Sequence, residues 1–186
     1  DFPVRHALFT HIDDRLEGRN FDRNKILITV HPACKDIWFW LIPFPNGRAS
    51  LGVVVPPAEL AKYPGTNEEK LWKIISETRD LQALLEGAVA VRPVAEMSGY
   101  STRVKQLAGP RFALLGNAGE FLDPVFSSGV TVAFKSADLL VDPLLRQLAG
   151  ETVDWDADFS RPLKVGVDCF RIFVEAWYRG DLQEII

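Results

Sequence analysis

The sequence predicts an α+β fold in which an antiparallel sheet packs with helices. Short β-branched and aromatic runs separated by turn residues fill the first third of the chain, and this pattern is typical of antiparallel strands. Apolar residues recur at helical spacing in later segments. The 186 residues are enough for one full hydrophobic core.

The predicted strands come first in the chain. They span residues 5–12, 25–31, 37–43 and 48–55. Asn46-Gly47 lies between the last two runs, and this pair readily adopts positive φ at both central positions of a type I′ turn. We therefore expect 37–43 and 48–55 to pair directly as a hairpin.

The pattern changes after the strands. Apolar residues recur at helical spacing from Leu71 onward, and Thr66 with Glu69 three residues later matches a capping box. A helix is predicted from about Asn67 to Arg79. Residues 88–104 predict one or two further strands, and 111–116 predict a buried strand that stops at glycine.

A second helix is expected after Gly116 and its loop, with Ser127 or Ser128 as N-cap. Its apolar stripe consists of Val130, Ala133, Phe134, Ala137, Leu140 and Val141. Asp142-Pro143 is predicted to restart the helix and Gly150 to end it.

The last predicted helix carries apolar residues from Phe159 to Trp177, with Pro162 in its first turn or at a kink. We expect three regions along the chain. They are 1–110, a sheet with one helix; 111–150, a strand–loop–helix; and 151–186, a helical region.

Composition limits the function classes. A net charge of -4 with scattered Lys and Arg gives no footprint for nucleic acid, so a small-molecule or protein partner is expected. No apolar run reaches the ~18 residues of a transmembrane span. Cys34 and Cys169 lack metal-type spacing and fit buried thiols in a reducing cytoplasm, and no metal site is predicted. The first residue, Asp1, predicts an internal start.

The stretch LLGNAGEFLDPVFSSGVTVAF, residues 114–134, is the strongest candidate for chemistry. A strand ends at Gly116, and a loop containing Gly119 and Pro124 leads to a helix start near Gly129. Such a start presents backbone N–H groups and the positive end of the helix dipole. It is suited to an anion or to an electron-rich ring edge.

This stretch resembles the second FAD-contacting motif of the flavoprotein monooxygenase and halogenase superfamily, G-D-A-x-x-F-x-D-P-x-x-S-x-G-x-x-x-A, with Asn117 in place of aspartate. The resemblance implies that the aspartate position meets the ribityl hydroxyls, the proline backs the ring system and the helix-start amides meet the pyrimidine edge. The implied FAD contacts are Gly116, Asn117, Asp123, Pro124, Ser128, Gly129 and Val130. The amides of Ser128 and Gly129 are further expected to hold halide.

A second motif strengthens the resemblance. Trp38-Phe39-Trp40-Leu41-Ile42-Pro43 matches W-x-W-x-I-P, the signature of flavin-dependent halogenases. The resemblance implies that Trp38, Trp40, Ile42 and Pro43 form a partition between flavin and substrate. Stiff, bulky rings suit a partition because they exclude water at little cost in rotamer entropy.

Two features bear on the substrate. Phe126 occupies a substrate-pocket position where tryptophan-type halogenases place a glutamate for the indole nitrogen, which argues against tryptophan as substrate. The ending FVEAWYRGDLQEII is similar to the closing helix of halogenases that act on phenols or carrier-bound rings. An aromatic small molecule or a carrier-bound ring is therefore the expected substrate.

The resemblance implies the carboxy-terminal, substrate-side portion of an FAD-dependent monooxygenase-like fold, without its amino-terminal βαβ unit. No G-x-G-x-x-G occurs in the chain, and no lysine matches the family's catalytic position, so no catalytic residue is assigned. The implied reaction is oxidation of halide through a peroxyflavin, with a separate flavin reductase as partner. We expect the chain alone to be inactive.

Two alternatives remain open at this stage. One is a related flavoprotein that hydroxylates or reduces, and the other is a binding or scaffold protein that keeps the fold, which Asn117 and the absent nucleotide-binding half favour. His6, His11 and His31 are expected to be structural or solvent-facing and not catalytic. Lys135 and Asp138 are expected to be solvated, and Glu120 has no assigned role.

Overall fold

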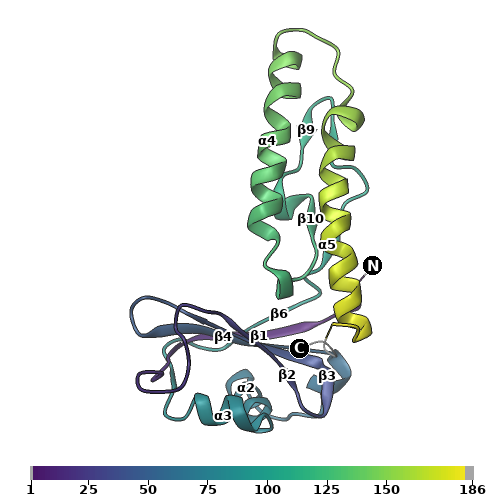
Figure 1. Cartoon of the computed structure of the whole chain (residues 1–186). Helices are drawn as coiled ribbons and strands as arrows, with labels where there is room; N and C mark the ends of the chain where they lie inside the picture. The colour runs from purple at the N-terminus through teal and green to yellow at the C-terminus, as the bar shows by residue number, and fades with distance from the viewer. Residues whose placement is uncertain (1, 183–186) are drawn as a thin grey trace. The chain divides into compact units, whose positions relative to one another are not determined.

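A computed structural model describes residues 2–182 of the chain (Figure 1). These residues divide into two compact units: one is Val4–Gly99, and the other combines residues 2–3 with residues 100–182. The predicted regional boundaries at 110 and 150 both fall inside the second unit.

The first unit contains a six-stranded antiparallel sheet. Its strands are β1 (His6–Asp13), β2 (Leu27–His31), β3 (Cys34–Pro43), β4 (Arg48–Val55), β5 (Val89–Ala90) and β6 (Ala95–Ser98). They are ordered β2-β3-β4-β1-β5, and β6 also pairs with β1. The predicted antiparallel sheet and its first four strands are confirmed.

The β3–β4 hairpin forms as predicted, but its turn is not type I′. Only Gly47 has positive φ, at 77°, whereas Asn46 does not. A two-residue turn would pair Pro45 with Arg48, and proline has no N–H to donate. Instead the Phe44 amide donates to the Arg48 carbonyl at 2.7 Å, which makes a three-residue loop with a left-handed glycine.

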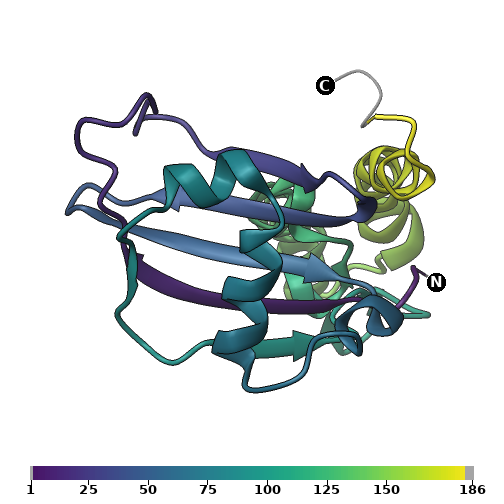
Figure 2. The ribbon, with the colours of Figure 1, turned by 90° about the horizontal axis from the view of Figure 1, so that it is seen from below.

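Helices cover one face of this sheet (Figure 2). They are α1 (Pro57–Leu60), α2 (Asn67–Ser76) and α3 (Arg79–Leu84). The core lies between them and the sheet, and its fully buried side chains include Leu8, Phe39, Leu51, Leu71 and Ile74.

The predicted capping box is confirmed, since Thr66 and Glu69 exchange both of its hydrogen bonds. The helix ends at Ser76, earlier than predicted, because the chain turns and starts α3 at Arg79. Neither α1 nor α3 was predicted, because each is too short to show a periodic pattern.

The second unit is built mainly of two long helices. Its elements are β7 (Thr102–Arg103), β8 (Ala108–Gly109), β9 (Phe112–Ala113), the 3₁₀ turns η1 (Gly116–Ala118) and η2 (Pro124–Phe126) with β10 (Glu120–Phe121) between them, α4 (Gly129–Leu148), the π-helical turn η3 (Asp156–Ser160) and α5 (Arg161–Arg179). α4 and α5 lie side by side (Figure 1). β7 pairs with β10 and β8 pairs with β9.

The predicted buried strand at 111–116 is wrong. Within this range only Phe112 and Ala113 form a strand, they pair with β8 alone, and Phe112 is 46% exposed. The strands expected in 88–104 appear as β5, β6 and β7, and β7 belongs to the second unit.

The predicted restart at Asp142-Pro143 is also wrong, because α4 runs unbroken through Pro143. Pro143 is buried on the same helix face as Val132 and Ser136, and a restart would break that face. The face that α4 buries is not the predicted apolar stripe, because two stripe residues are largely exposed: Val130 is 68% and Phe134 is 75% exposed.

The end of α4 and the start of α5 agree with the prediction. Gly150 follows α4 with φ 89°, and its amide and that of Glu151 bind back to the carbonyls of Gln147 and Arg146, as in a Schellman motif. Pro162 lies in the first turn of α5, as expected.

Cys169 on α5 is exposed and Cys34 half-buried, so the expectation of two buried thiols is wrong.

Candidate functional site

Gly116 packs the start of the loop directly against α4. Its backbone has φ 51°, a conformation that residues other than glycine rarely adopt. A Cβ at this position would lie 3.0 Å from the Cβ of Ala133. The Gly116 amide donates to Ser136 Oγ at 2.9 Å, so a buried serine of α4 anchors the start of the loop. Backbone conformation and close packing therefore both require glycine here.

Asn117 lies at the start of α4. A Cβ added to Gly129 would lie 3.2 Å from Asn117 Oδ1, so the side-chain oxygen and the first residue of the helix are near neighbours. Asn117 is exposed. The fold thus brings together two residues that the motif separates by twelve positions.

Asp123 is the buried member of the predicted set, at 3% exposure. Its Oδ1 accepts the Val125 amide at 2.9 Å and caps η2, and its Oδ2 accepts the hydroxyl of Tyr178 on α5. Tyr178 was missed by sequence reasoning. It stands in the family-like ending of the chain, but nothing in a linear pattern pairs it with Asp123.

The start of α4 differs in one detail from the prediction. Ser128 occupies the N-cap position, but its side chain makes no capping hydrogen bond. The preceding Ser127 is left-handed, with φ 51°. The amides of the first turn, including Gly129 and Val130, have no helical carbonyl to bind, and the Ser128 side chain does not satisfy them.

An ion pair lies beside this loop. Glu120 accepts from Arg171 of α5, and their side chains are 11% and 16% exposed. The guanidinium also lies over the ring of Phe2, 5.2 Å from its centroid. Burial, followed by the nearby Arg103, lowers the pKa of Arg171 from its usual value. Arg171 remains a cation at any physiological pH.

Phe126, the predicted substrate-pocket residue, belongs to an aromatic cluster. Its ring meets Phe173 and Trp177 of α5 edge to face, with centroids 6.0 and 6.3 Å apart. Such pairs stabilise beyond the burial of their area. The position is therefore fixed by α5.

The tryptophans of the second motif share a sheet face in the first unit. β3 alternates, so Trp38, Trp40 and Ile42 point away from the face that α2 and α3 cover. Trp40 donates from Nε1 to Ser50 Oγ at 3.0 Å, and its ring centroid lies 5.9 Å from that of Trp38. Pro43 ends the strand opposite Ala49.

Gly52 on β4 makes the position of Trp40 possible. It is paired with Trp40 across the ladder, and a Cβ there would lie 2.2 Å from the indole ring. The ring therefore lies flat over a glycine. Phe9 on β1 is also paired with Gly52, and its ring centroid lies 6.2 Å from that of Trp40.

The three histidines have ordinary partners. His6 meets Glu96 at 2.6 Å, His31 is buried with one ring nitrogen 3.3 Å from Glu77 and the other accepting an amide, and His11 packs on Phe44. Exposed Lys135 and Asp138 form an ion pair at 2.7 Å.

Residues 2–182 contain no group of three or more His, Cys, Asp or Glu side chains arranged to hold a metal ion. None of the helices in this part of the chain combines the length and apolar character needed to cross a bilayer.

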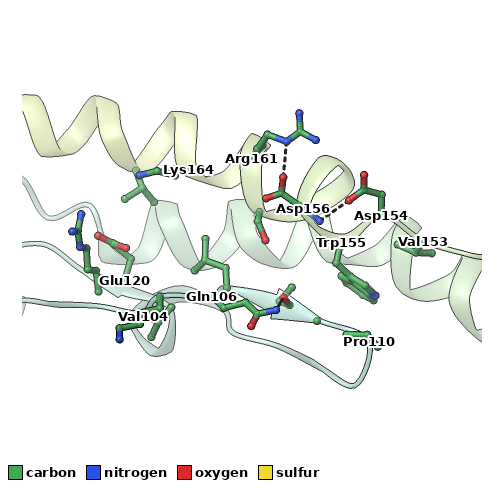
Figure 3. Close-up of a pocket in the computed structure, with 17 residues that line it drawn as sticks. Val104, Gln106, Pro110, Glu120, Val153, Asp154, Trp155, Asp156, Arg161 and Lys164 are labelled. Atoms are coloured by element: carbon green, nitrogen blue, oxygen red, sulfur yellow. Dashed lines mark hydrogen bonds and ion pairs between the residues drawn. The ribbon is translucent and has the colours of Figure 1, made fainter.

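A pocket of about 1010 Å³ lies between the 103–110 segment and the start of α5 (Figure 3). Its labelled side chains are mostly polar, and Arg161 pairs with Asp156 on its rim. Glu120 lines it, but none of the predicted flavin or halide contacts does. It therefore does not form part of the predicted site.

The comparisons with known proteins agree with the two motifs. The sequence profile described as tryptophan halogenase matches residues 24–183. The chain is 26% identical over 182 residues to the 1H-pyrrole-2-carbonyl-[peptidyl-carrier protein] chlorinase of Pseudomonas fluorescens, covering 94% of this chain and 39% of that protein. It is 30% identical over 147 residues to a flavin-dependent halogenase of Penicillium aethiopicum, covering 75% and 28%.

Solved structures agree as well. A flavoprotein/dehydrogenase from Cytophaga hutchinsonii superposes with a TM-score of 0.89 at 37% identity, over 98% of this chain and 44% of that one. The myxobacterial chondrochloren halogenase, an FAD-dependent halogenase variant, gives 0.81 at 27% identity, over 94% and 41%. The chain thus spans less than half the length of these relatives.

Proposed function

This chain belongs to the tryptophan halogenase family, and from that premise we propose that it is the substrate-side portion of an FAD-dependent enzyme that halogenates an electron-rich aromatic ring. The observation that carries the proposal is the convergence of the predicted motif on the start of α4. Gly116 packs on Ala133, and Asn117 reaches Gly129. Relatives named as a chlorinase and as flavin- or FAD-dependent halogenases support the same reaction class.

The residues at this point fit a flavin. The glycine at 129 leaves no side chain beside Asn117, and the amides that begin α4 remain available to an electron-rich edge. We propose that Asn117 contacts the ribityl chain, that Pro124 backs the ring and that Ser128, Gly129 and Val130 present amides to it. FAD, when bound, supplies the redox chemistry that uses oxygen to oxidise halide.

The same helix start is our proposed halide site. The amides of Ser128 and Gly129 lie at the positive end of the α4 dipole, which favours an anion. In the first unit, the side-chain face formed by Trp38, Trp40 and Ile42 is our proposed partition between flavin and substrate, with Pro43 closing the strand. The Trp40 ring is held by its hydrogen bond to Ser50 and by its flat contact with Gly52.

For the substrate, we propose an aromatic small molecule or a ring bound to a carrier protein. A relative named for a carrier-bound pyrrole substrate matches 94% of this chain. Phe126 brings an aromatic ring and no carboxylate to its position, which argues against tryptophan as the substrate. A separate flavin reductase is the proposed electron source.

Turnover by the full-length protein tests this function. The protein is supplied with FAD, a flavin reductase, oxygen, chloride or bromide and a panel of phenols and carrier-bound pyrroles, and products are identified by mass spectrometry. Halogenated products that require halide support the proposal. Hydroxylated or reduced products, the same with and without halide, would contradict it.

A related flavoprotein that hydroxylates or reduces without halogenating is the second candidate. It is favoured by the similarity to the Cytophaga hutchinsonii protein, which carries a flavoprotein/dehydrogenase description. A scaffold protein without flavin is the third, and Asn117 in place of aspartate favours it. An absorbance spectrum of the purified full-length protein separates this last candidate from the other two.

Asn117→Asp is expected to tighten FAD binding about tenfold in the full-length protein, because a charge-assisted hydrogen bond is stronger than a neutral one. A carboxylate beside the start of α4 would also meet the helix dipole favourably. The dissociation constant is measured by flavin fluorescence titration. Asn67→Asp at the start of α2 is the matched control and should leave it unchanged. Weaker binding by Asn117→Asp would show that asparagine suits a different contact.

The 186-residue chain alone is proposed to bind FAD poorly and to be inactive. A Gly-rich βαβ unit normally grips the pyrophosphate of a dinucleotide, and no G-x-G-x-x-G occurs in this sequence. Calorimetric titration with FAD checks this expectation. A tight, stoichiometric complex of this chain would contradict the proposed division of contacts.

A further inference from the structure

The loop that carries the proposed flavin contacts is held by α5. Loop side chains at every third position, 120, 123 and 126, meet this helix. The contacts are the Glu120–Arg171 ion pair, the hydrogen bond from Tyr178 to Asp123, and the ring contacts of Phe126 with Phe173 and Trp177. The loop geometry therefore depends on a helix more than forty residues further along the chain.

Asp123 is the central contact of the three. One carboxylate oxygen caps η2 through the Val125 amide, and the other accepts the Tyr178 hydroxyl. A carboxylate at 3% exposure is costly unless its oxygens accept hydrogen bonds. Removing the hydroxyl would leave this oxygen with one donor fewer, and the carboxylate would be free to turn away from Val125.

The turn that Asp123 caps ends in an unfavourable backbone conformation. The Ser127 amide donates to the Pro124 carbonyl at 2.9 Å, and Ser127 then adopts φ 51° and ψ 32°. A left-handed serine persists only where surrounding contacts enforce it. Ser127 immediately precedes the first amides of α4, so relaxation of this turn would move the proposed halide site.

We infer that Tyr178 is a positioning residue for this site: through Asp123 it fixes the η2 turn and thereby the amides at the start of α4. The expected effect of Tyr178 on the binding of flavin and halide rests on the proposed function. The structural part, that Tyr178 holds the loop, stands on the contacts alone. Tyr178 also packs on Phe2, with ring centroids 6.3 Å apart, and Tyr178→Phe keeps that ring while removing the hydroxyl.

The experiment compares Tyr178→Phe with the wild type in the full-length protein. Hydrogen exchange of amides 125–130 without flavin should become roughly tenfold faster, because one hydrogen bond to a charged group is lost. With FAD bound, the apparent dissociation constant for bromide should rise roughly tenfold and the flavin absorbance spectrum should shift. Asp123→Asn, which keeps the side-chain shape, should show the same changes, and the double variant should add little.

Tyr63→Phe is the matched control, because its hydroxyl also donates to a carboxylate, Glu77, at 2.8 Å, within the first unit. It should change neither loop exchange nor bromide affinity. If Tyr178→Phe lowers the melting temperature but leaves loop exchange and the flavin spectrum as in wild type, the hydroxyl is merely structural and the inference is overturned. If the wild type takes up no FAD, the proposed function fails, and the exchange data alone then decide whether Tyr178 fixes the loop.

Discussion

Gly52→Ala is expected to displace the Trp40 indole and to lower the free energy of unfolding by about 1–3 kcal/mol. A Cβ at position 52 would lie 2.2 Å from the ring, far inside van der Waals contact, and the ring cannot move without losing its bond to Ser50. Alanine in place of a strand glycine would by itself stabilise by about 0.5–1 kcal/mol. The steric term is the larger, so the net effect is destabilising.

Two measurements check this prediction. Urea unfolding gives the stability, and circular dichroism reports the exciton coupling of the Trp38–Trp40 pair, whose ring centroids are 5.9 Å apart. Gly166→Ala is the control, since Gly166 is exposed within α5 and has no atom within 4 Å of an added Cβ. It should stabilise by about 0.5–1 kcal/mol. An unchanged exciton signal in Gly52→Ala would contradict the assigned position of Trp40.

Gly116→Ala is expected to destabilise the protein by about 2–3 kcal/mol and to weaken FAD binding in the full-length protein. Two costs add at this residue. Alanine is strained at φ 51°, and its Cβ would lie 3.0 Å from the Cβ and 3.3 Å from the Cα of Ala133. The loop would have to move off α4, taking Asn117 away from Gly129.

Gly150→Ala separates the two costs. Gly150 has φ 89° but no atom within 4 Å of an added Cβ, so it carries the backbone cost of about 1 kcal/mol without the steric one. Chemical unfolding of both variants and flavin titration in the full-length protein provide the comparison. If Gly116→Ala is no less stable than Gly150→Ala, the close contact with α4 does not constrain the loop.

Local features were predictable because their causes lie within a few residues. The Thr66–Glu69 capping box is confirmed, since its partners are three residues apart and the helix geometry brings them together. The alternation that puts Trp38 and Trp40 on one face follows from the period of a strand. The family assignment also came from the sequence, because it depends on residue types at fixed spacing, and it is confirmed.

Two predictions failed because residues outside the motif itself decided the outcome. Proline at 143 predicted a helix restart, yet α4 continues because its buried face spans both sides of that residue. The Asn46-Gly47 turn differs because Pro45 cannot donate to Arg48. Local preference was overridden in the first case by packing and in the second by the missing N–H of a flanking residue.

By itself the sequence determined the antiparallel strands, the capped helix, the family and the residues of the proposed flavin loop. Only the tertiary structure decided what holds that loop: Ser136 on Gly116, Arg171 on Glu120 and Tyr178 on Asp123. These partners are separated by 20, 51 and 55 residues. No periodicity links positions so far apart, because their contact arises only when α4 and α5 pack beside the loop and bury its polar groups together.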